Sequence, residues 1–158
     1  MLSLPVQLTK INKRNTTVEK KTHTVKNIFI TSLIKMVLYL SPTYKGKKHD
    51  KTICDLEHIK FDVPVVLWED LGFIGLNPDN ADVRRPVKKP KNRELREDEK
   101  IFNRQISSQR VIVEHVIGEC KIFRIVKDEV RARKDDFHDT CILLACGLNN
   151  FKIKCLKT

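Results

Sequence analysis

The sequence predicts a mixed α/β domain, and three observations support this fold class. Runs rich in β-branched and aromatic residues indicate strands. Segments whose apolar residues recur three or four positions apart indicate helices. These segments follow one another as strand, strand, helix, strand, basic loop and then helices, which is an α/β or α+β order. The 158 residues suffice for one domain.

Three strands are expected in the first half of the chain. Thr24–Ser32 and Lys35–Tyr44 are predicted to pair through a tight two-residue turn at Leu33 and Ile34. Pro64–Glu69 is a short continuous apolar run, which is typical of a strand buried on both faces.

The expected helices begin at Asp50, at Glu97, at Ser107 or Ser108, and at Asp135. Asp50 is a plausible N-cap for a helix that extends to Lys60. The helix capped by one of the two serines is predicted to extend to about Phe123, and the last helix to Leu148.

The charge balance favours a polyanionic partner, most simply nucleic acid. Lys and Arg number 31, Asp and Glu number 20, and the net charge is +11. Residues 1–22 are basic and poorly periodic, and they are equally compatible with a solvated tail and with a polyanion-binding face. Pro86 and Pro90 exclude a helix from a second basic segment, which is predicted to be an extended surface loop. Its candidate DNA-binding residues are Arg84, Arg85, Lys88, Lys89, Lys91 and Arg93.

The five cysteines form no CxxC pair, and no secretory signal opens the chain. Reduced, mostly buried thiols in a cytoplasmic protein are therefore expected. The apolar stretch Ile28–Leu40 is interrupted by Lys35 and is too short to span a bilayer, so no membrane partner is expected.

Two acidic residues are candidates for chemistry. Asp70 directly follows the buried strand, at the carboxyl end where α/β sheets build their sites, although a turn or capping role is the plainer reading. On a helix, Glu114 lies about 40° round from Arg110, and Lys121 lies about 20° round on the same side. This stripe also fits an ordinary exposed Arg–Glu pair.

Several motifs together resemble one known family. The spacing of Arg110, Glu114 and Lys121 matches the signature around the last acid of bacterial insertion-sequence transposases, with Ser107 where that family has Tyr. The segments KKTHTVKN, LYLSPTYKGKKHDKTICD, EDLGFIGL, PVKKPKNREL and ACGLNNF follow in the same order. The chain therefore resembles the DDE endonuclease domain of these transposases over roughly residues 20–151.

The resemblance implies a ribonuclease H-like fold and a DNA strand-transfer enzyme. In this family three carboxylates hold two divalent ions, usually Mg²⁺ and alternatively Mn²⁺. By motif match Asp70 is the second carboxylate and Glu114 the third, while Arg110 and Lys121 would face the phosphates.

The family's first acid, on its opening strand, has no counterpart, because no Asp precedes Asp50 and Glu19 adjoins the KKTHT motif. The resemblance thus implies a copy truncated at the amino end, with the central first strand missing or replaced and 23–151 as a partial catalytic domain before a 152–158 tail. Residues 2–8 are a candidate replacement, although Pro5 argues against a central strand. We expect little or no cleavage by this chain alone, and a homodimer or a complementing amino-terminal fragment as partner. A non-catalytic nucleic-acid-binding module is the alternative.

Overall fold

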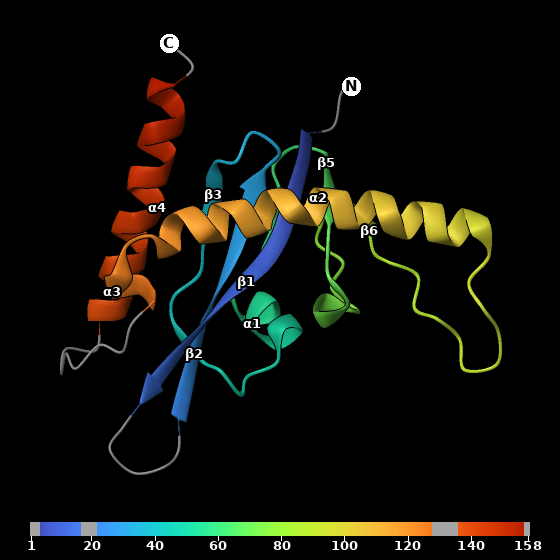
Figure 1. Ribbon diagram of the computed structural model, residues 1–158, viewed down its shortest axis with the longest axis horizontal. Helices are drawn as coiled ribbons and strands as arrows, with labels where there is room; N and C mark the ends of the chain where they lie inside the picture. Colours follow the sequence, from blue (N-terminus) through green and yellow to red (C-terminus); the bar gives the residue numbers. More distant parts are fainter. Residues whose placement is uncertain (1–3, 17–21, 128–135, 157–158) are drawn as a thin grey trace.

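The computed structural model describes residues 4–16, 22–127 and 136–156 as a mixed sheet covered by helices on both faces (Figure 1). The α/β class is therefore confirmed. The strands are β1 (Leu4–Thr16), β2 (Thr22–Ser32), β3 (Val37–Leu40), β4 (Tyr44–Lys45), β5 (Val65–Trp68) and β6 (Ala81–Arg84). The helices are α1 (Asp50–Leu56), the 3-10 turn η1 (Leu71–Phe73), α2 (Glu97–Lys121), α3 (Arg124–Lys127) and α4 (Phe137–Cys155).

The sheet has the order β3-β2-β1-β5-β6, and β4 pairs with β2 beside β3. β1 is antiparallel to β2 and parallel to β5, and β5 is parallel to β6. The central β1 thus joins an antiparallel half of the sheet to a parallel half.

Successive residues of β2 face opposite sides of the sheet and build two separate cores. Ile28 and Ile30 pack on one face against α1, β5 and the η1 segment, through Ile53, Leu67 and Phe73. Phe29 packs on the other face against α2 and α4, through Val116, Ile142 and Cys146. α2 crosses this second face over the strands (Figure 1), so the packing of Phe29 helps to fix the helix that carries Glu114.

β1 occupies the central position for which the resemblance implied a missing or replaced strand, and it includes residues 4–8 of the candidate replacement segment. Pro5 precedes the β1–β2 ladder, which begins at Val6 opposite Ser32, but it lies within the β1–β5 ladder, opposite Val66. A proline at the start of a strand, before the antiparallel ladder begins, removes no donor from that ladder.

α1 is attached to the sheet by a buried ion pair. The Lys26 ammonium donates to Asp50 Oδ1 at 2.8 Å and to the Lys48 carbonyl at 2.6 Å. Both side chains are at least nine-tenths buried. The N-cap is His49, and Asp50 is the first helical residue, with its carboxylate bound to Lys26.

Several boundaries differ from the predicted ones. The first hairpin turn is longer than two residues: Ser32 binds the backbone of both Lys35 and Met36, and Lys35 adopts a left-handed conformation (φ 67°). Ser107 and Ser108 lie exposed inside one continuous α2, where the Ser108 hydroxyl donates to the Gln105 carbonyl at 2.7 Å and the buried face continues past both residues. α4 extends past Leu148 to Cys155, and so includes part of the predicted tail; its predicted start, Asp135, lies outside the described residues.

Four cysteines are buried and Cys155 is exposed. Within the described ranges, none of the helices is long and apolar enough to cross a membrane.

Candidate active site

Asp70 lies two residues beyond the end of β5, at the carboxyl edge of the parallel half of the sheet. Its Oδ1 accepts a hydrogen bond of 2.7 Å from the Leu71 amide and so caps η1. The capping role that the sequence favoured is therefore present. It leaves Oδ2 directed to a different partner.

That partner is Arg110 of α2. The Arg110 Nη1 lies 3.6 Å from Asp70 Oδ2, and its Nε lies 3.4 Å from Glu114 Oε1. Because one planar guanidinium contacts both carboxylates, the two oxygens lie within about 10 Å of each other. Two acids 44 positions apart in the sequence thus meet on one side of α2.

All three side chains are substantially exposed, between 41% and 60%. Exposed ion pairs of this kind contribute little to stability, roughly 1 kcal/mol or less each. Asp70 and Glu114 offer hard carboxylate oxygens, the ligand type that Mg²⁺ and Mn²⁺ prefer. In the described part of the chain, no group of three His, Cys, Asp or Glu side chains has the geometry to hold a metal.

Lys121 is the last residue of α2, two helical turns beyond Glu114 and about 10 Å along the axis. It is half-buried. The structure brings Asp70, Arg110 and Glu114 together and places Lys121 at the far end of the same helix.

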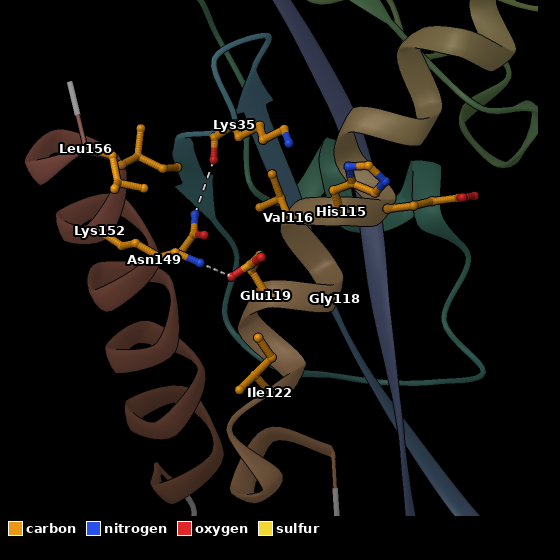
Figure 2. A pocket seen from close by; sticks show the side chains of 11 residues that line it. Lys35, His115, Val116, Gly118, Glu119, Ile122, Asn149, Lys152 and Leu156 are labelled. Carbon is orange, nitrogen blue, oxygen red and sulfur yellow. Dashed lines mark hydrogen bonds and ion pairs between the residues drawn. The ribbon is translucent and has the colours of Figure 1, made fainter.

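A pocket of about 560 Å³ lies between α2 and α4, beside Glu114 (Figure 2). Its charged residues are partly neutralised, because Lys152 of α4 donates to Glu119 Oε2 at 2.7 Å and thereby lowers the pKa of Glu119. Asn149 donates to the Lys35 carbonyl at 3.2 Å, and both residues line the pocket. The pocket thus offers mostly apolar surface next to the carboxylate site.

Two members of the predicted basic loop, Arg84 and Arg85, have their guanidinium groups bound within the fold. Arg84 ends β6, where it lies over the Trp68 ring at 5.3 Å and pairs with Asp82. Arg85 pairs with the fully buried Glu69. The assignment of Arg85 as a DNA-binding residue is therefore unsupported by its position, because its guanidinium is occupied within the fold.

The other four basic residues lie in the loop that leads into α2. Arg93 forms a two-pronged pair with Glu99, both bonds being 2.8 Å, and this pairing lowers the pKa of Glu99 to about 2. Lys89 pairs with Glu94. Lys88 and Lys91 are exposed, and neither has a carboxylate partner among the described residues. These two lysines are the most available to a polyanion.

Sequence reasoning missed Glu69, which directly precedes Asp70. Its Oε2 accepts from Arg85 Nε at 2.7 Å, while its Oε1 is buried without a hydrogen-bond partner among the described residues. Burial raises the pKa of Glu69, and Arg85 opposes that shift. The signal available in the sequence was an acid directly after an apolar strand, but its partner lies sixteen residues away.

Comparison with known proteins identifies the family of the chain. The family profile described as DDE superfamily endonuclease matches residues 5–150, so the chain belongs to the DDE superfamily of endonucleases. A probable transposase for insertion sequence element IS702 from Microchaete diplosiphon is 31% identical over 109 residues. That match covers 69% of this chain and 39% of the relative's length. No solved structure gives a significant match. The predicted resemblance is confirmed.

Proposed function

We propose that this chain is a transposase-type DDE endonuclease domain with a ribonuclease H-like fold that acts on DNA phosphodiesters. The observation that carries the proposal is the meeting of Asp70 and Glu114 on one guanidinium, at the carboxyl end of β5. Family membership supports it. In this assignment Asp70 and Glu114 bind divalent metal, and Arg110 and Lys121 contact phosphate.

Each residue has a defined task. Bound Mg²⁺ or Mn²⁺ would supply activation of the attacking water or 3′-hydroxyl and stabilisation of the leaving oxygen. Asp70 provides Oδ2, because the Leu71 amide occupies Oδ1 and fixes the carboxylate plane. Arg110 compensates the two negative charges in the free protein and can turn to a DNA phosphate when a cation replaces it.

The site has a shortage of carboxylates. β1 occupies the central strand position beside β5, and its sequence Leu4–Thr16 contains no Asp or Glu. Two carboxylates bind Mg²⁺ more weakly than three and do not position two ions. We therefore propose a weakly active or inactive copy, which an amino-terminal fragment carrying the first acid would complete.

Manganese binding tests the assignment. We expect purified protein to bind Mn²⁺ weakly, and Asp70→Ala or Glu114→Gln to lower the affinity by at least about tenfold. Losing a ligand should matter no less than losing a ligand's hydrogen-bond partner, which weakens binding about 10–100-fold. Calorimetry or the electron paramagnetic resonance of free Mn²⁺ measures the affinity.

Glu119→Gln is the matched control, because Glu119 also lies on α2 and is also ion-paired. The Mn²⁺ affinity of the Glu119→Gln variant should equal that of the unmodified chain. Equal Mn²⁺ binding by the Asp70 and Glu114 variants would refute the assignment. Metal-dependent nicking of DNA by the chain alone, lost in Asp70→Ala, would refute the inactive status.

DNA binding by the basic loop makes a separate prediction. Replacing Lys88 and Lys91 together by Gln should reduce the slope of log K against log salt by about 2, since each phosphate contact contributes about 0.9. Fluorescence anisotropy with duplex DNA at several salt concentrations measures the slope. The pair variant Arg93→Gln/Glu99→Gln removes an internal pair without changing net charge, and should leave the slope unchanged. A slope unaffected by the lysine variant would exclude the loop from the interface.

A non-catalytic nucleic-acid-binding module is the second candidate. The observation that favours it is that the described residues contain no three-ligand metal group. Such a module would bind DNA with the same salt dependence and show no Mn²⁺ binding that depends on Asp70.

A further inference from the structure

We infer that Arg85, with Glu69, is a positioning residue that holds the Asp70 carboxylate in place for metal and substrate; this inference rests on the proposed function. Arg85 binds both ends of one short segment. Before Asp70, its Nε donates to Glu69 Oε2 at 2.7 Å. After Asp70, its Nη2 donates to the Leu76 carbonyl and, at 3.1 Å, to Asn77 Oδ1.

Residues 70–77 therefore form a loop closed by one guanidinium. A backbone hydrogen bond also holds the residue before this loop, because the Glu69 amide donates to the Arg84 carbonyl at 3.0 Å. Inside the loop, Phe73 is 1% exposed and anchors η1 in the core, and Gly75 adopts a positive φ of 89° to complete the turn. The Asp70 side chain caps η1, so any shift of η1 also shifts the carboxylate.

The burial of the pair points to positioning rather than to DNA contact. The Glu69 side chain is 0% exposed and that of Arg85 is 27% exposed. A buried ion pair contributes little net stability relative to apolar residues of similar volume. Apolar residues would not replace the directional hydrogen bonds that Arg85 donates to Leu76 and Asn77.

The decisive variant is therefore the apolar pair Glu69→Met/Arg85→Met. We expect it to remain folded by circular dichroism, yet to bind Mn²⁺ about 10–100-fold more weakly, the range for lost supporting contacts at metal sites. The bonded amides of Leu71, Phe73 and Leu76 should exchange with solvent at least about tenfold faster, while the Val65 amide of β5 keeps its protection. Arg85→Lys keeps the charge but loses the forked guanidinium. Its Mn²⁺ affinity and amide exchange rates should therefore lie between those of the unmodified chain and those of the double variant.

Lys26→Met/Asp50→Leu is the matched control, since it removes another buried ion pair and leaves the Arg85 bonds intact. It should preserve both Mn²⁺ affinity and the exchange rates of residues 70–77. Wild-type affinity and exchange in the Glu69/Arg85 variant would overturn the inference and leave the proposed function standing. If the unmodified chain binds no Mn²⁺, the proposed function fails, and the exchange rates alone decide whether Arg85 holds the loop.

Discussion

Phe29→Ala should lower the free energy of unfolding by about 3–5 kcal/mol, the usual range for removing a buried phenyl ring. Phe29 is fully buried in the centre of β2, and it contacts the cluster formed by α2 and α4. The cavity would lie directly under the helices, so their packing, and with it the placement of Glu114, should loosen. Urea unfolding followed by circular dichroism measures the change.

Phe151→Ala is the control for the same chemical change at an exposed position. Phe151 is 66% exposed on α4, so its loss should change stability by no more than about 0.5 kcal/mol. Similar losses for the two variants would mean that the packing of Phe29 against α2 and α4 is not as described.

Lys26→Met should be nearly as damaging, at about 3–5 kcal/mol, because it leaves the buried Asp50 carboxylate without its lysine. It also removes the 2.6 Å bond to the Lys48 carbonyl, which holds the loop before α1. Chemical denaturation again provides the measurement.

Adding Asp50→Leu should recover most of this loss, because an apolar pair avoids the cost of a buried charge. Lys51→Met is the control, because it breaks an exposed ion pair with Asp55. It should lower the free energy of unfolding by less than about 1 kcal/mol. If the double variant is as unstable as Lys26→Met, the damage comes from lost packing rather than from the buried charge.

The parts of the fold that the sequence predicted correctly are those governed by local patterns. The β-branched run of β2 and the apolar run of β5 identify their strands, and Ile53 with its neighbours identifies α1. The relation of Asp70 to Glu114 came from the resemblance to the transposase family, because the strand end and the helical spacing do not by themselves connect the two residues. The metal-binding role of these residues stays a prediction.

The remaining features depend on contacts between distant segments. β6 is short, and its ladder to β5 rather than its own residues makes Ala81–Arg84 a strand. Arg85 looks like another loop cation until Glu69 is placed beside it. Ser107 and Ser108 favour a helix start locally, yet the buried side of α2, from Ile106 to Val113, continues across them.

The two halves of the sheet are joined along a short seam. β1 meets β5 through only four aligned positions, Leu4–Gln7 against Val65–Trp68, although it meets β2 along eleven. The partners at this seam are about sixty residues apart in sequence, so closing it costs more chain entropy than forming the β1–β2 hairpin. We therefore expect the β1–β2 hairpin to form early in folding and the β1–β5 ladder to form late. The carboxylate pair would come into existence only at that last step.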